Sequence, residues 1–329
     1  MRDNKTVLIT GGAGFIGSHT CKFLLGRDRC VVSVDNFSDN YSPEYKRENI
    51  KCVQRAAGSA NNRFESFEGD IRDAVFLDGV FRETRPDIVI HLAACAGVRS
   101  SVLNPGLYAD VNVNGTVNIL ECMKNHGIGK LLFASSSSVY GNNAKLPFCE
   151  SDPADRPLSP YAATKRAGEL ICHTYHHLYD INIACLRFFT VYGPGQRPDL
   201  AIYRFTESVL KGKPIPFYGD GSSERDYTFI EDIIDGIWRA AIWADNGEKR
   251  FDVFNLGGSA AVTLSETVAA IESEAGVGAV LDFKPQQPWE VYKTSADISH
   301  SKAVLGYNPG TEFKKGIKAF VDWYKRSRL

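Results

Sequence analysis

The sequence contains no hydrophobic run long enough to cross a bilayer, for which about 20 apolar residues are needed. Its first ten residues, MRDNKTVLIT, also lack the long apolar segment of a secretory signal. Neither sign of charge is in excess, because 38 Lys and Arg accompany 39 Asp and Glu. We therefore expect a cytoplasmic protein that binds neither membranes nor nucleic acid.

The eight cysteines include no CxxC pair and no Cys/His cluster with the spacing of a zinc site. Isolated cysteines of this kind are typical of free thiols in a reducing compartment. We expect no metal site and no disulfide framework.

The first half of the chain alternates β-rich runs with segments of helical length and period. The expected strands are Thr6–Thr10, Cys30–Asp35, Arg63–Glu68, Asp87–Leu92, Lys130–Ser135 and Asn182–Phe188. The expected helices between them are Phe15–Leu25, Ala74–Thr84, Leu107–Asn125 and Tyr161–Tyr179. Strands that alternate with crossover helices predict a parallel sheet covered on both faces, which is a doubly wound α/β fold of the Rossmann type.

After Phe188 glycine and proline become more frequent and the expected elements are shorter. Helices are expected near 200–211, 231–244 and 265–275, with a last one from Glu312. The change predicts a first domain at 1–188 and a smaller α/β lobe at 189–329, with an interleaved boundary. Residues 39–62 are polar, and we expect a mobile excursion there.

A glycine-rich segment follows the first expected strand and opens the first helix. Gly11, Gly14 and Gly17 form a GxxGxxG pattern, which permits a tight turn, backbone approach to a pyrophosphate and close helix packing. Asp35 ends the second strand about 20 residues later, where a carboxylate accepts ribose hydroxyls and repels a 2′-phosphate. The pattern predicts an NAD site in residues 1–188.

Further cofactor contacts are expected beside these motifs and where later strands end. The residues predicted on this ground are Phe15, Ile16, Asn36, Asp70, Ile71, Leu92, Ala93, Ala94 and Ser135.

A tyrosine and a lysine lie four residues apart at the start of an expected helix. Ser159 and Pro160 give a strong helix start, and Tyr161 and Lys165 then share one helical face. A phenol has a pKa near 10, but a nearby ammonium and a positive nicotinamide both favour the phenolate. With the serines at 135–138, the pair predicts a site that deprotonates a secondary alcohol.

The chain resembles the nucleotide-sugar epimerases of the extended short-chain dehydrogenase/reductase superfamily over nearly its whole length. The segments that carry the resemblance are TGGAGFIG at 10–17, SSSSVYG at 135–141 and SPYAATK at 159–165. The resemblance implies an isomerase with Ser136, Tyr161 and Lys165 as catalytic residues. It also implies NAD contacts from Asp35, Asp70, Asn112, Tyr161 and Lys165.

The residues before Val139-Tyr140-Gly141 indicate which reaction to expect. Dehydratases of this superfamily carry an Asp-Glu pair there, and UDP-glucuronate decarboxylases carry a glutamate. This sequence has Ser137-Ser138 instead. Without an acid to assist elimination, oxidation followed by reduction remains, which predicts 4-epimerisation through a transient 4-keto sugar.

The segment LRFFTVYGPGQRPDLA at 186–201 resembles the UDP-glucuronate 4-epimerases, and glucose-type relatives usually place asparagine where Thr190 lies. The resemblance implies conversion of UDP-glucuronate to UDP-galacturonate. We expect Ser137, Ser138 and Thr190 to hold the sugar carboxylate and so to prevent loss of CO2.

The resemblance also implies a nucleotide-sugar site, mainly in residues 189–329. Arg225 and Arg197 are expected on the nucleotide side, because guanidinium groups suit phosphate. The other substrate contacts it implies are Arg99 and Ser136 at the sugar, Phe217 and Tyr218 at the uracil, and Glu290 at the ribose. Trp289-Glu290 replaces the Gly-Asp usual in the family, which changes the expected shape of the nucleoside pocket.

Three other functions remain open from the sequence. One is epimerisation of UDP-glucose or UDP-N-acetylglucosamine, and another is a decarboxylase or dehydratase. The third is a non-catalytic NAD-binding scaffold, which the intact Ser136, Tyr161 and Lys165 argue against. The resemblance further implies a homodimer joined through helices at 107–125 and 161–179.

Overall fold

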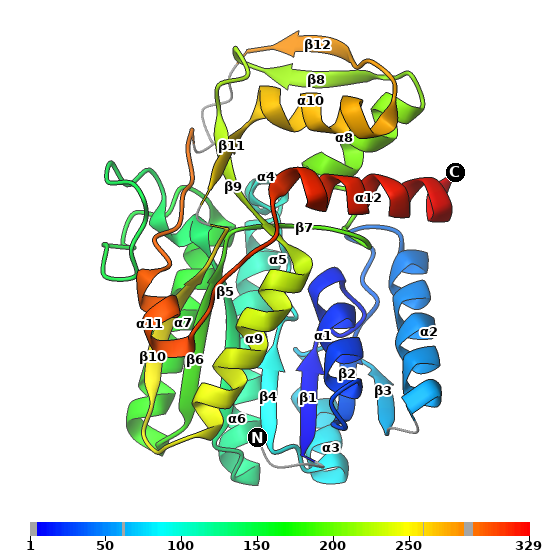
Figure 1. Cartoon of the computed structure of the whole chain (residues 1–329). Helices are drawn as coiled ribbons and strands as arrows, with labels where there is room; N and C mark the ends of the chain where they lie inside the picture. The colour runs from blue at the N-terminus through cyan, green and yellow to red at the C-terminus, as the bar shows by residue number, and fades with distance from the viewer. Residues whose placement is uncertain (1–4, 61–62, 259, 286–291) are drawn as a thin grey trace. The chain divides into compact units, whose positions relative to one another are not determined.

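The computed structural model describes residues 5–60, 63–258, 260–285 and 292–329, so Trp289 and Glu290 lie outside the described residues. By internal contacts the chain divides into two compact units (Figure 1). The first unit comprises Met1–Gly141, Pro153–Arg187 and Ile234–Phe254. The second unit comprises Asn142–Asp152, Phe188–Ile233 and Asn255–Leu329.

This division differs from a single boundary after residue 188 in two places. Residues 234–254 return to the first unit because strand β10 (Phe251–Leu256) pairs beside β6 (Asn182–Phe188) at the edge of its sheet. Residues 142–152 belong to the second unit, where the backbone of Phe148 hydrogen-bonds to Ser295 and Asp297.

The first unit is built on a seven-stranded sheet. Its other strands are β1 (Thr6–Thr10), β2 (Cys30–Asp35), β3 (Phe64–Glu68), β4 (Ile88–His91) and β5 (Lys130–Ser136). The order is β10-β6-β5-β4-β1-β2-β3, and the pairs from β3 to β5 are parallel. The predicted doubly wound fold is therefore confirmed. The strand order reverses between β1 and β4, and such folds bind ligands beyond the carboxyl ends of the strands at this point.

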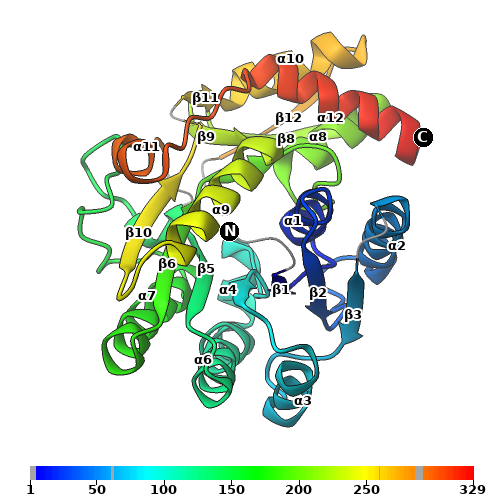
Figure 2. The ribbon, with the colours of Figure 1, turned by 60° about the horizontal axis from the view of Figure 1, so that its bottom comes forward.

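Helices cover both faces of this sheet. They are α1 (Phe15–Leu25), α2 (Pro43–Ala60), α3 (Ala74–Thr84), α4 (Val98–Leu103), α5 (Pro105–Ala109), α6 (Gly115–His126), α7 (Pro160–Tyr179), most of α9 (Ile230–Asp245), the π turn η1 (Asp110–Asn114) and the 3-10 turn η2 (Ser137–Tyr140). Figure 2 shows α3, α6 and α7 on one face and α1, α2 and α9 on the other. None of the helices within the described residues is both long and apolar enough to span a membrane.

The expected helix 107–125 is present as the continuous helical run of α5, η1 and α6 from Pro105 to His126, with the π turn η1 inside it. The polar segment 39–62, where a mobile excursion was expected, is mostly helical, because α2 fills residues 43–60. Ile50, Val53 and Ala57 have helical spacing and are buried, so this mainly polar helix packs through one narrow apolar stripe.

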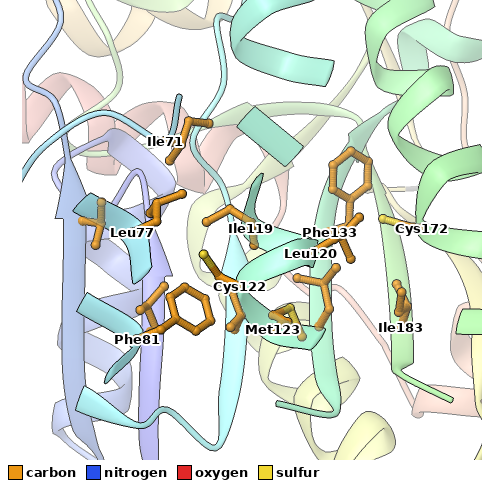
Figure 3. Close-up of a cluster of buried hydrophobic side chains, with 14 of the residues drawn as sticks. Ile71, Leu77, Phe81, Ile119, Leu120, Cys122, Met123, Phe133, Cys172 and Ile183 are labelled. Carbon is orange, nitrogen blue, oxygen red and sulfur yellow. The ribbon is translucent and has the colours of Figure 1, made fainter. Parts of the chain in front are cut away.

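The core of the first unit lies between the sheet and helices α3, α6 and α7 (Figure 3). Leu77 and Phe81 of α3 pack in one cluster with Ile119 and Met123 of α6, and all four are fully buried. Burial of one such side chain contributes roughly 1.5–3 kcal/mol, so this packing holds the strand ends in fixed positions.

The described residues of the second unit form two small sheets. In one, β7 (Thr190–Tyr192) is parallel and β11 (Ala261–Thr263) antiparallel to β9 (Glu224–Phe229). The other pairs β8 (Pro214–Tyr218) with β12 (Val280–Lys284) in parallel. The helices of this unit are α8 (Ala201–Leu210), α10 (Leu264–Ala275), α11 (Ser299–Leu305) and α12 (Phe313–Arg328).

Candidate active site

The glycine-rich turn between β1 and α1 has the geometry of a phosphate-binding loop. Gly11 has a φ of +73°, and a Cβ there would lie 2.8 Å from the backbone nitrogen of Ala93. A Cβ on Gly17 would lie 2.1 Å from the carbonyl oxygen of Gly11. Gly14 caps α1 without a side-chain bond, and the first turn of this fully described helix carries no acid. Backbone N–H groups at such an end can bind a pyrophosphate.

Asp35 ends β2 beside this loop. One carboxylate oxygen accepts the N–H of Ala13 at 3.1 Å, and the other accepts the N–H of Phe37 at 2.9 Å. Lys46 on α2, which the sequence analysis missed, places its ammonium 3.4 Å from Asp35 and 3.0 Å from the Ser38 hydroxyl. A carboxylate has about four acceptor positions, so Asp35 can still accept a ribose hydroxyl.

Asn36 and Asp70, both predicted at the cofactor, lie together at the ends of β2 and β3. The Asn36 amide donates to Asp70 at 2.8 Å, and the guanidinium of Arg72 donates to both carboxylate oxygens. The bonds from Arg72 are the main reason that the pKa of Asp70 falls to about 2. The neighbouring Ile71 points its side chain into the core (Figure 3).

The loop after β4 contains Leu92, Ala93 and Ala94, all half-buried. The backbone N–H of Leu92 donates to the carbonyl of Thr10, and that of Ala93 donates to the Thr10 hydroxyl at 3.2 Å. These bonds hold the loop against the end of β1 and beside Gly11.

Asn112 holds the continuation of this loop. Its amide oxygen accepts the N–H of Cys95 at 2.8 Å, and its amide nitrogen donates to the Cys95 carbonyl at 3.0 Å. The same nitrogen donates to the Thr164 hydroxyl at 2.9 Å. Asn112, expected as a direct NAD contact, thus joins the loop after β4 to helix α7.

Tyr161 and Lys165 lie one turn apart on α7. The helix starts as predicted, because the Ser159 hydroxyl accepts the N–H of Ala162 and Pro160 fills the first position. Lys165 is buried, and its ammonium donates to the carbonyl of Ala134 at 2.7 Å. Burial lowers the pKa of Lys165 to about 8. Tyr161 is half-buried, with its ring edge-on to that of Tyr108.

The serines at the end of β5 have different environments. The hydroxyl of Ser136 accepts the N–H of Ser138 and hydrogen-bonds to the Ser138 hydroxyl, both at 3.1 Å. Ser137 and Ser138 are half-buried in η2, and no acid occupies the two positions before Val139. Ser135 donates to Glu169 at 2.5 Å, so its hydroxyl is engaged within the protein.

Glu169 is the centre of a buried ion-pair network that the sequence analysis missed. It accepts two bonds from Arg187 at 2.8 and 2.9 Å and one from Arg166 at 2.8 Å. Burial is the largest influence and raises the pKa of Glu169, but the bonds and charge of Arg187 together with the bonds from Ser135 and Arg166 outweigh it and leave the pKa lowered. Its position four residues after Lys165 was the available signal, since both lie on one face of α7. The network fixes α7 to the ends of β5 and β6.

The remaining predicted substrate residue of the first unit, Arg99, is exposed on α4.

The second unit contains the other predicted contacts that the structure describes. Thr190 begins β7 and is half-buried. Arg197 forms a two-bond ion pair with Asp199, and Arg225 on β9 donates to the carbonyls of Glu224 and Tyr292.

Phe217 and Tyr218 end β8, the segment expected at the uracil. Phe217 is buried and packs edge-to-face on Phe283 of β12. Tyr218 is half-buried and pairs with Lys284 in the sheet register.

Known proteins match the chain along almost its whole length. A family model described as GDP-mannose 4,6 dehydratase matches residues 8–320. UDP-glucuronate 4-epimerase 4 of Arabidopsis thaliana is 42% identical over 333 residues, which cover 97% of this chain and 75% of that protein.

Two solved structures have the same fold. The structure of UDP-glucuronic acid 4-epimerase from Bacillus cereus in complex with UDP-glucuronic acid and NAD has a TM-score of 0.89 and 35% identity, covering 98% of this chain and 99% of that chain. UDP-glucose 4-epimerase from Thermotoga maritima with UDP-glucose has a TM-score of 0.87 and 29% identity, covering 98% and 100%. The chain therefore belongs to the GDP-mannose 4,6 dehydratase family, which is of the short-chain dehydrogenase/reductase type.

Proposed function

We propose that this protein is an NAD-dependent UDP-sugar 4-epimerase whose substrate is UDP-glucuronate. The main support is the pair Tyr161 and Lys165 on α7, with Lys165 docked on the end of β5 beside Ser136. The match to UDP-glucuronate 4-epimerases over almost the whole chain supports the same activity.

The loop and carboxylate of the first unit fit NAD. Gly11 and Gly17 allow a tight backbone packing of the loop that a Cβ would block, and Asp35 disfavours a 2′-phosphate by charge repulsion. When bound, NAD supplies the removal and return of hydride at carbon 4 of the sugar.

The protein's own residues carry the proton. Tyr161, as the phenolate, takes the proton of the sugar 4-hydroxyl during oxidation and returns it during reduction. The Lys165 ammonium favours the phenolate by its charge, and Ser136 orients the hydroxyl.

The serines before Val139 favour epimerisation over elimination. A dehydratase needs a side chain that removes and delivers protons, and Ser137 and Ser138 have hydroxyls of much higher pKa. The family model is described as a dehydratase, but this chain lacks the acids of that reaction.

We propose that Ser137, Ser138 and Thr190 hydrogen-bond the glucuronate carboxylate. A carboxylate that keeps its hydrogen bonds is poorly placed to leave as CO2 from the keto intermediate. The proposal favours UDP-glucuronate over UDP-glucose and UDP-N-acetylglucosamine.

The experiment incubates the protein with each of these three UDP-sugars, without reductant, and identifies products by NMR. We expect UDP-galacturonate from UDP-glucuronate and slower turnover of the other two. A deoxy-keto or pentose product from the wild type contradicts the proposed reaction. Thr190→Ala should slow glucuronate turnover and release more UDP-pentose, and unchanged product ratios would remove Thr190 from the proposal.

We also propose a homodimer. Leu170 and Leu178 of α7 are 54% and 58% exposed, and Leu107 of the neighbouring α5 is 41% exposed. Apolar side chains on such helices suit burial against a second copy. Light scattering after gel filtration tests this, and a monomeric mass at micromolar concentration excludes it.

A further inference from the structure

His91, the last residue of β4, is 2% exposed and has no part in the proton transfer proposed above. Both nitrogens of its ring have hydrogen-bond partners. Nδ1 lies 2.6 Å from the Thr10 hydroxyl at the end of β1. Nε2 lies 3.1 Å from the Thr116 hydroxyl on α6.

The hydrogen bonds around the neutral ring of His91 allow only one assignment of donors and acceptors. The Thr116 hydroxyl donates its single proton to the carbonyl of Asn112 at 2.6 Å, so it must accept from Nε2–H of His91. In the neutral ring Nδ1 then carries no proton and accepts from the Thr10 hydroxyl. That hydroxyl in turn accepts the N–H of Ala93 at 3.2 Å.

The result is one continuous chain of bonds with a single polarity. It runs from the Ala93 N–H through Thr10, His91 and Thr116 to the Asn112 carbonyl in the π turn. The side-chain amide of Asn112 extends these links through hydrogen bonds to the backbone of Cys95 and to the hydroxyl of Thr164, the neighbour of Lys165. The chain therefore links the loop beside Gly11 to the catalytic helix.

The surroundings of His91 favour its neutral form. Burial and, second, the charge of Lys165 on α7 lower the pKa of His91 to about 3. The other elements at the ring present Thr10 from β1, Phe133 from β5 at a centroid distance of 5.9 Å, and Thr116 from α6. None of these three side chains titrates between pH 4 and 9.

We propose that His91 is a positioning residue for the proposed epimerase reaction. As a neutral imidazole with its proton on Nε2, it holds the loop after β4 and the π turn in the single arrangement that places α7 and the cofactor loop. A proton on Nδ1 would face the proton of the Thr10 hydroxyl, which would have to rotate away and lose His91 as its acceptor.

The variants His91→Gln and His91→Leu test this role. Glutamine keeps one acceptor and one donor, whereas leucine keeps the bulk and removes both. We expect His91→Gln to keep kcat within about threefold and His91→Leu to lower it about tenfold or more, with KM for the UDP-sugar changed less. Equal kcat values for the two variants, at similar melting temperatures, would overturn the proposal.

A second pair of variants covers the case in which His91→Leu does not fold. Thr116→Val removes the link between His91 and Asn112. Thr20→Val removes an equivalent bond in α1, where the buried Thr20 hydroxyl donates to the carbonyl of Ile16 at 2.9 Å. We expect lower kcat only for Thr116→Val, and equal losses in both variants would contradict the proposal.

The tautomer of His91 can be determined by NMR without measuring enzymatic turnover. In a ¹⁵N spectrum of labelled protein, the His91 signals are those that disappear in His91→Gln. We expect the neutral Nε2–H tautomer from pH 5 to 8. The Nδ1–H tautomer, or protonation near pH 6.5, would overturn the proposal even in an active epimerase. Failure of the wild type to convert any UDP-sugar would instead contradict the proposed function and leave this reading intact.

Discussion

The two units of this chain use their buried polar groups differently. In the first unit, buried charged and polar side chains such as Lys165, Glu169 and His91 form networks that end at the candidate site. In the second unit, the largest buried side chains include four tyrosines, and two of them donate to backbone carbonyls, Tyr192 to Phe313 and Tyr307 to Gly257.

The buried groups of the first unit position side chains of the candidate site, whereas the buried tyrosines of the second unit mainly contribute to packing. Burying a network of charged groups costs desolvation free energy. Its hydrogen bonds are strongly directional, so they hold the side chains of the network in narrow ranges of position. A buried tyrosine adds a large apolar area and needs only one acceptor. We therefore expect changes in the first unit to affect chemistry and those in the second to affect mainly stability and binding.

The largest expected effect is loss of turnover in Tyr161→Phe. Without the phenol, the sugar hydroxyl has no base, so kcat should fall about 1000-fold while UDP-sugar binding persists. NMR of products and a binding titration measure the two. Tyr108→Phe is the matched control, since Tyr108 donates to the Ala96 carbonyl. Full activity in Tyr161→Phe would remove the proposed base.

The next effect is on stability. Glu169→Leu should lower the free energy of unfolding by about 3–5 kcal/mol, because Arg187 then stays buried without its partner. Asp322→Leu in the second unit breaks an exposed pair with Lys318 and should cost less than about 0.5 kcal/mol. Urea denaturation measures both, and similar costs would erase this contrast between the units.

An intermediate effect concerns pH. The folded state keeps His91 neutral, whereas the unfolded chain binds a proton below about pH 6.5. The contribution of His91 to the free energy of unfolding is therefore complete above pH 6.5, and it is lost as the pH falls toward the pKa of His91 in the folded state. Between pH 7.5 and 5, the wild type should lose about 2 kcal/mol more stability than His91→Gln. Urea denaturation at both pH values checks this, and parallel losses would show that folded His91 is protonated.

The smallest expected effect is a change in stability on replacing Gly79 by alanine, which we compare with the same replacement of Gly17. Gly79→Ala in α3 has open space around the added Cβ and should stabilise by about 0.5–1 kcal/mol. Gly17→Ala should instead destabilise and weaken NAD binding, because its Cβ meets the Gly11 carbonyl. Thermal unfolding with and without NAD measures both, and equal NAD responses in the two variants would contradict the role of the glycine loop.

Much of the first unit could be predicted because its signals are local. β1, β2 and β6 have the predicted bounds, as do α1 and α3, since each is set by hydrophobic period and a clear start or stop. The π turn η1 could not be predicted, because it lies within the helical run from Pro105 to His126 and leaves no signal of its own in the hydrophobic period. The short strands of the second unit were missed for a similar reason, since three-residue runs such as β7 and β11 carry no period.

The sequence alone determined the fold class, the glycine loop, Asp35 and the spacing of Tyr161 and Lys165, because each depends on residues close together in the chain. Only the tertiary structure decided that Lys46 joins Asp35, that Arg187 neutralises Glu169 and that His91 links Thr10 to Thr116. These partners lie 11 to 81 residues apart. Which buried donor meets which acceptor depends on how the strands and helices pack, and a one-dimensional pattern does not contain that information.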